Sequence, residues 1–172
     1  MTRDQKIVLA GAASGIVAMT ASVSVLYRLW PATPTLGLTD TASRLAYSLE
    51  ANAFTVLPLL IGIIAVGNGR FLSEAIDPTL RKESRAMEIN GRVVENTLQQ
   101  YLRYLVGTLA LSVNLTADEM RVIPATAIVF VVARIAFWIG YRIHPLYRAF
   151  GMAATGYLNL GILAFAIWRI VR

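Results

Sequence analysis

The feature that most constrains this chain is a series of five apolar stretches, each close to the length that crosses a membrane. A transmembrane α-helix needs roughly 20 mostly apolar residues. The chain has 172 residues, of which 56% are hydrophobic and only 15% are charged, whereas about a quarter of the residues of a soluble domain are charged. The stretches cover residues 7–29, 45–66, 93–115, 120–141 and 150–171. We therefore expect an all-α fold, an integral membrane helical bundle with almost no soluble mass.

Rare and missing residue types exclude several kinds of site. The chain has no cysteine, which excludes disulfides, thiolate metal sites and a cysteine nucleophile. Its single histidine, His144, excludes two-histidine ligation within one chain, so we expect neither metal nor haem. The net charge of +6 would suggest a nucleic-acid partner in a soluble protein. Here the basic residues lie mainly at the ends of the stretches, where they anchor helices, so we expect contact with membrane lipids and no nucleic acid.

The first two stretches carry local signals of their own. Stretch 7–29 follows a short basic segment and so has the form of a signal peptide. Because its apolar run covers about a full bilayer thickness, we interpret it as a retained first span, with a cleaved signal as the alternative. Gly11 and Gly15 permit close approach of another helix. In the second stretch, Pro58 predicts a kink.

The distribution of basic residues predicts the orientation of the chain. With five spans, nine basic residues fall on the side of the N-terminus and five on the other side. The positive-inside rule then places the N-terminus in the cytoplasm and the C-terminus outside.

Several polar residues interrupt the third and fourth stretches. At about 100° per residue, one narrow helix face carries Arg85, Glu88, Arg92, Asn96, Gln99 and Arg103, which we call the polar stripe; Glu95 and Gln100 flank it. Charge inside a membrane costs a few kcal/mol, so this face must meet protein or a wet cavity. In the fourth stretch Arg134, Phe137 and Tyr141 share one face, and Arg148 follows after a turn.

Two interpretations of these polar residues are open. One is a pocket for a small anion, because the planar fork of arginine binds carboxylates through paired hydrogen bonds. The other is ion pairing between helices, such as Glu88 or Glu95 with Arg92 or Arg134. The excess of basic over acidic residues on these faces favours the anion.

Residues 45–172 resemble the MAPEG superfamily, the membrane-associated proteins of eicosanoid and glutathione metabolism. The resemblance rests on four motifs in the family's order: Gly67-Asn-Gly-Arg70; Arg92-Val-Val-Glu-Asn96-Thr-Leu-Gln99, which is similar to Arg-x-x-x-Asn-x-x-Glu; Arg134, Phe137, Tyr141 and Arg148 at the spacing of leukotriene-type synthases; and the segment 144–151, which is similar to bacterial members. It implies a four-helix transmembrane domain at 45–172. Residues 1–44 would then form an added transmembrane helix and a connecting loop.

The resemblance also implies a function. Family members are homotrimers that hold glutathione between subunits, which suggests a glutathione-dependent transferase or peroxidase acting on lipophilic electrophiles in a bacterial inner membrane. The positions that match glutathione-binding residues are Arg70, Arg92, Asn96, Gln99, Arg134 and Tyr141. Arg148 matches the arginine that stabilises the glutathione thiolate, a sensible role because a nearby guanidinium lowers the pKa of a thiol.

Two residues depart from the family pattern. Gln99 stands where the family usually has glutamate, and Phe137 stands where leukotriene-type enzymes have tyrosine. These departures favour an alternative, a non-catalytic scaffold or accessory subunit of a larger membrane complex. A small transporter is a third interpretation, disfavoured because the chain shows no repeats or broken-helix signals.

Overall fold

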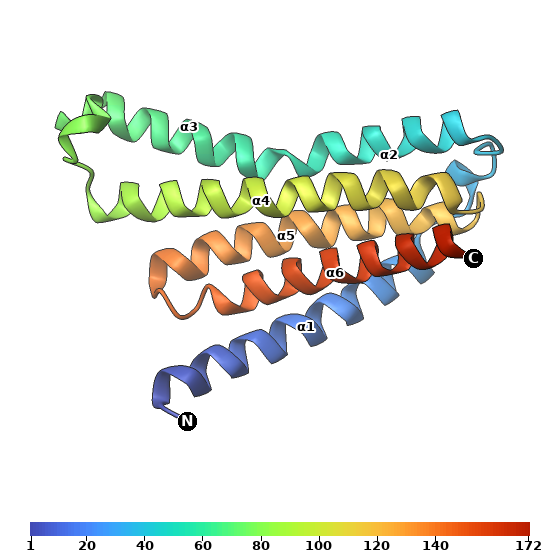
Figure 1. Cartoon of the computed structure of the whole chain (residues 1–172), viewed down its shortest axis with the longest axis horizontal. Helices are drawn as coiled ribbons and strands as arrows, with labels where there is room; N and C mark the ends of the chain where they lie inside the picture. The colour runs from blue at the N-terminus through green and yellow to red at the C-terminus, as the bar shows by residue number, and fades with distance from the viewer.

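The computed structural model describes all 172 residues and is helical throughout (Figure 1). The α-helices are α1 (Arg3–Leu29), α2 (Thr41–Thr55), α3 (Leu57–Phe71), α4 (Arg85–Asn114), α5 (Val122–Ile143) and α6 (Ala149–Val171). Short 3₁₀ turns lie between them: η1 (Thr33–Thr35), η2 (Glu74–Ile76), η3 (Pro78–Leu80) and η4 (Glu119–Arg121). The chain runs back and forth, so its two termini lie at opposite ends of the bundle (Figure 1).

We name the two ends of the bundle by the terminus that each contains. The N-terminal end holds Met1, the α3–α4 connection and the α5–α6 turn (Figure 1). The C-terminal end holds the α1–α2 and α4–α5 connections and Arg172 (Figure 1).

Four segments are both long enough and apolar enough to cross a membrane, namely Arg3–Leu29, Thr41–Phe71, Glu119–Ile143 and Ala149–Val171. Helix α4 has 30 residues, about 45 Å at 1.5 Å per residue, but it is not apolar enough to meet the same criterion. It lies against α3 and α6 along their length (Figure 1). The predicted fold class, an all-α integral membrane bundle, is confirmed.

The second span differs from its predicted form. The expected kink is a break at Val56, where α2 ends and α3 begins, and Pro58 lies in the first turn of α3. Proline is tolerated there because the first turn of a helix has no partner for its N–H group. The span also covers 41–71 instead of 45–66, since the Asp40 side chain accepts a hydrogen bond from the Ser43 N–H (3.0 Å) and starts α2 earlier.

Helix α1 approaches α6 most closely at two glycines. A Cβ atom on Gly15 would overlap the backbone of Phe150, and one on Gly11 would lie 3.3 Å from the Cβ of Ala149. The predicted close approach of another helix is therefore confirmed, and that helix is α6. Gly15 is the one buried residue of α1, and the half-buried Met19, Val23 and Leu26 of this helix pack against the core.

The C-terminal end of the bundle is closed by aromatic packing and an ion pair. The rings of Tyr104 and Phe130 lie 4.6 Å apart, and the Tyr104 hydroxyl hydrogen-bonds to Thr126 (3.0 Å). Glu119 accepts the Thr116 N–H (2.7 Å) and pairs with Arg169 (2.8 Å). The charges of Glu119 and Arg169 at this end are thus paired within the chain.

Candidate functional site

Helix α4 has two polar faces that differ in their surroundings. Its inward face is buried, and its amides and hydroxyls bond to neighbouring helices. Thr97 accepts a hydrogen bond from Arg134 (2.8 Å), and Gln100 accepts one from Asn159 (2.8 Å). The polar stripe lies on the other side, where all of its residues are exposed except the half-buried Asn96.

A ladder of two aromatic rings between two arginines connects α5 to the start of α6. The Arg134 guanidinium lies over the Phe137 ring at 4.1 Å, and Phe137 meets Tyr141 edge to face at 5.9 Å. The Arg148 guanidinium lies over the Tyr141 ring at 4.9 Å. These cation–π contacts fix the position of Arg148 and hold both rings between two positive charges.

The stripe and the ladder meet at a cavity of about 460 Å³ at the N-terminal end of the bundle. Its polar lining consists of Arg92, Glu95, Asn96, Gln99, Tyr141 and Arg148. The apolar lining includes Phe137, Leu146, Ala149 and Met152, with Val8 from α1. We call it the arginine pocket. Five of the seven residues predicted for the site line it: Arg92, Asn96, Gln99, Tyr141 and Arg148.

Arg134 lies outside the arginine pocket. It is 1% exposed, and its guanidinium donates to Thr97 (2.8 Å) and to Thr155 (3.2 Å). Its Nε has no partner. Phe137, which lines the pocket, stacks on this guanidinium and so separates it from the pocket.

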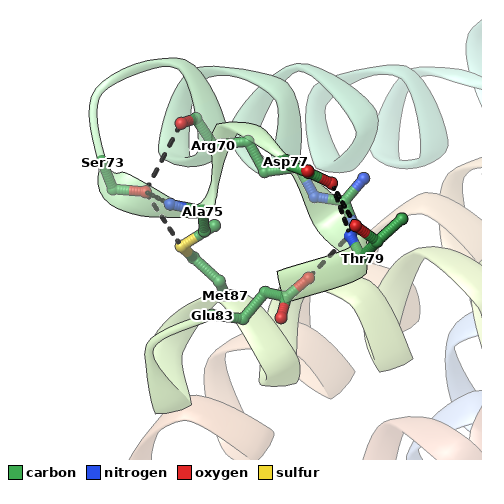
Figure 2. Close-up of polar contacts among 7 residues, drawn as sticks. All are labelled: Arg70, Ser73, Ala75, Asp77, Thr79, Glu83 and Met87. Carbon is green, nitrogen blue, oxygen red and sulfur yellow. Dashed lines mark hydrogen bonds and ion pairs between the residues drawn. The ribbon is translucent and has the colours of Figure 1, made fainter. Parts of the chain in front are cut away.

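Arg70 also lies outside the pocket, at the end of α3, and it pairs with Glu83 (3.5 Å) (Figure 2). In the same connection Asp77 accepts hydrogen bonds from the Thr79 hydroxyl (2.6 Å) and N–H (2.8 Å) (Figure 2). These bonds lower the pKa of the Asp77 carboxyl below its usual value, with the hydroxyl contributing most. The acids Glu74, Asp77 and Glu83 of this connection therefore have their partners close by.

The alternative of ion pairing between helices is not realised by these side chains. The four ion pairs within 4.0 Å are Arg70–Glu83, Lys82–Glu74, Arg121–Asp118 and Arg169–Glu119. None of them includes Arg92, Arg134 or Arg148. Arg92 instead lines the arginine pocket together with Tyr141.

Glu95 is a pocket residue that was not predicted for the site. It lines the arginine pocket beside Gln99, one helical turn away on the same side of α4. The spacing of four residues between Glu95 and Gln99 places both on one side of the helix, but the sequence alone did not show that the pocket opens on that side of the stripe.

The comparisons with known proteins agree with a membrane location. No protein-family model matches the chain, and no solved structure matches it. The chain is similar to Transmembrane protein 79 of Mus musculus, with 26% identity over 129 residues, which is 75% of this chain and 32% of that protein. It is likewise similar to Transmembrane protein 79 of Bos taurus, with 26% identity over 128 residues, 74% of this chain and 31% of that protein. The chain thus spans about a third of the length of these relatives. The name of the relatives and the apolar helices of this chain both support a membrane location.

Proposed function

We propose that this chain is a membrane-bound, glutathione-dependent transferase or peroxidase with a MAPEG-like domain at residues 45–172. The observation that carries the proposal is the convergence of Arg92, Asn96, Gln99, Tyr141 and Arg148 on one pocket. Its volume of about 460 Å³ lies within the usual range for small-molecule sites. The unpaired guanidinium of Arg92 suits a carboxylate of glutathione.

Arg148 is the residue that we assign to catalysis. Its guanidinium favours the thiolate over the thiol because it places a positive charge beside the sulfur. The thiol proton passes to solvent. The sulfur lone pair then forms a bond to the electrophilic carbon of the second substrate, and the leaving group departs with the electron pair of its broken bond. The stacking of Arg148 on Tyr141 keeps the guanidinium in place for this step.

Glu95 provides a carboxylate for the amino group of glutathione. The family motif has glutamate at the position of Gln99, and that carboxylate is missing here. Glu95 lies in the same pocket one turn away, so a carboxylate is retained at a shifted position. The apolar wall opposite, which includes Leu146 and Met152, suits a lipophilic electrophile that enters from the bilayer.

We further propose that the protein is a homotrimer whose pockets are completed by neighbouring subunits. Arg92, Glu95, Gln99 and Arg103 are exposed on α4, and facing lipid would cost each charged side chain about 3 kcal/mol at mid-membrane. A second copy would cover them. Because the chain has no native cysteine, cross-linking of an Arg103→Cys variant in membranes tests this directly. Cross-linked dimers are expected, and their complete absence would contradict the interface.

The proposed location is a bacterial inner membrane, with the N-terminus in the cytoplasm and the C-terminus in the periplasm. The excess of basic residues at the N-terminal end of the bundle supports this orientation. A reporter enzyme that works only in the periplasm should be active when it is fused after Arg172, and one that works only in the cytoplasm should be inactive there. Activity in the cytoplasm would overturn the orientation.

Glutathione binding to the purified protein tests the central proposal. Titration calorimetry should detect binding by the wild type and a loss of at least about tenfold in affinity for Arg92→Ala. Arg3→Ala is the matched control, because Arg3 is an exposed arginine at the same end that does not line the pocket. Absence of binding by the wild type would exclude the enzyme.

A non-catalytic scaffold is the second candidate. The observation that favours it is the placement of Arg134 and Arg70, both implied by the resemblance to bind glutathione, away from the pocket. The same titration separates the two candidates, because a scaffold would retain its assembly without binding glutathione.

A further inference from the structure

A second cavity lies next to the arginine pocket, between the start of α4 and the end of α5. It has a volume of about 400 Å³ and shares Tyr141 and Pro145 with the arginine pocket. Two other arginines line it, Arg85 from α4 and Arg142 from α5. The remaining lining is Ala86, Ile89 and Ile143. The cavity therefore combines positive charge with an apolar wall and includes no acidic residue.

Both charges of this cavity are unpaired, and one of them, Arg142, is held in place by a hydrogen bond. Neither Arg85 nor Arg142 belongs to an ion pair within 4.0 Å. The buried amide oxygen of Asn90 accepts hydrogen bonds from Arg142 (3.4 Å) and from the indole N–H of Trp138 (2.9 Å). Arg142 is thus positioned by an inward-facing residue of α4, and part of its donor capacity remains for a ligand. Glu88, the acid nearest to Arg85 along α4, is exposed and does not line the cavity.

The cavity lies where a membrane helix meets the lipid headgroups. Helices α5 and α6 have 22 and 23 residues, about 33 to 35 Å, which is close to the thickness of the hydrocarbon core. Arg142 stands in the last turn of α5 and Arg85 in the first turn of α4. Both arginines therefore fall at the boundary, with isoleucines beside them.

We propose that this cavity binds a phosphate group, carried by an anionic phospholipid of the leaflet at the N-terminal end. Two guanidiniums from different helices match the several oxygens of a phosphate. The apolar lining accommodates the glycerol and the first part of the acyl chains. This headgroup site is separate from the arginine pocket and does not depend on glutathione chemistry.

The test uses the full chain in neutral detergent and measures the midpoint of thermal unfolding while lipid is added. Phosphatidylglycerol is the anionic probe, phosphatidylcholine the zwitterionic one, and inorganic phosphate the soluble one. Arg85→Gln is the leading variant, because Arg85 makes no side-chain hydrogen bond and its loss should not alter the midpoint without lipid. Its apparent affinity for phosphatidylglycerol should fall about fivefold, and that of Arg85→Gln/Arg142→Gln by about 25-fold.

The control removes the same charge from the same end of the bundle. Arg3→Gln/Arg81→Gln changes two exposed arginines that do not line the cavity. If it weakens phosphatidylglycerol binding as much as the cavity variants do, or if phosphatidylcholine binds the wild type equally well, the site is overturned. If inorganic phosphate alone raises the midpoint of the wild type but not of Arg85→Gln, the phosphate site stands with a soluble ligand. Glutathione binding by Arg85→Gln should be unchanged, so a failure here is distinct from a failure of the proposed enzyme.

Discussion

The two ends of the bundle hold two ion pairs each, but Arg169 at one end and Arg92 and Arg148 at the other have different surroundings. At the C-terminal end Arg169 pairs with Glu119, and the rings of Tyr104 and Phe130 fill the space between α4 and α5. At the N-terminal end Arg92 and Arg148 are unpaired and line a cavity. An arginine bonded within the chain contributes to stability, whereas an unpaired one beside a cavity can hold an anion. A cavity of about 470 Å³ also lies towards the C-terminal end, but its lining includes Glu50 and no basic residue, so we propose the anion site at the N-terminal end.

Removal of Arg148 should have the largest effect. Arg148→Ala is expected to lower the rate of glutathione conjugation about 100-fold, because one group that stabilises developing negative charge contributes on that scale. The pKa of the bound glutathione thiol should rise, which the ultraviolet absorbance of the thiolate measures as a function of pH. Arg3→Ala serves as the control. An unchanged thiol pKa in Arg148→Ala would show that this arginine does not act on the sulfur.

A change at the closed end should affect stability and leave binding intact. Glu119→Ala removes both the bond to the Thr116 N–H and the pairing with Arg169. Because this pair is partly exposed, we expect a loss of about 1–2 kcal/mol in the free energy of unfolding, mostly from the lost cap. Denaturant titration in micelles measures it, with Glu74→Ala, an exposed ion-pair residue at the other end, for comparison. Weaker glutathione binding by Glu119→Ala would break the division between the two ends.

A smaller effect is expected for the one acid in the arginine pocket. Glu95→Gln should weaken glutathione binding about fivefold, the contribution of an exposed charge pair near its upper limit. N-acetylated glutathione, which lacks the amine, should bind the wild type and Glu95→Gln equally well. Glu88→Gln, an exposed glutamate outside the pocket, should change neither affinity.

The smallest effect is expected for Asp77 in the α3–α4 connection. The pKa of Asp77 is lowered by hydrogen bonds from Thr79. These bonds therefore stabilise the connection above the unfolded pKa of about 4, and their contribution is lost as the pH falls through the lower, folded value. Thr79→Ala should raise the pKa of Asp77 towards its usual value, as measured by NMR titration of the carboxyl carbon. Thr33→Ala, in a connection at the other end, should not change it.

Most of the fold follows from the sequence, because lipid permits few alternatives. Backbone groups in a bilayer must bond within their own helix, so long apolar runs have to be helices. The apolar stretches match the helices to within a few residues, except that Asp40 extends α2, that the second span breaks near Pro58, and that α4 begins at Arg85, eight residues before the predicted stretch. The reciprocal hydrogen bonds of Thr116 and Glu119 could also be predicted from the sequence, because the two residues are three positions apart.

The candidate site could be predicted only in part, because helical periodicity shows which residues share a helix face but not which other helices or cavities that face contacts. The spacing of Arg92, Asn96 and Gln99 groups them correctly. It could not show that Arg134 turns inward to Thr97 and Thr155, since these partners lie 37 and 21 residues away along the chain.

The sequence by itself therefore determined a membrane bundle with an arginine-rich face. Only the tertiary structure decided which arginines are bonded within the chain and which remain unpaired beside a cavity. The physical reason is that a guanidinium takes its role from the acceptors that other helices bring within hydrogen-bonding distance.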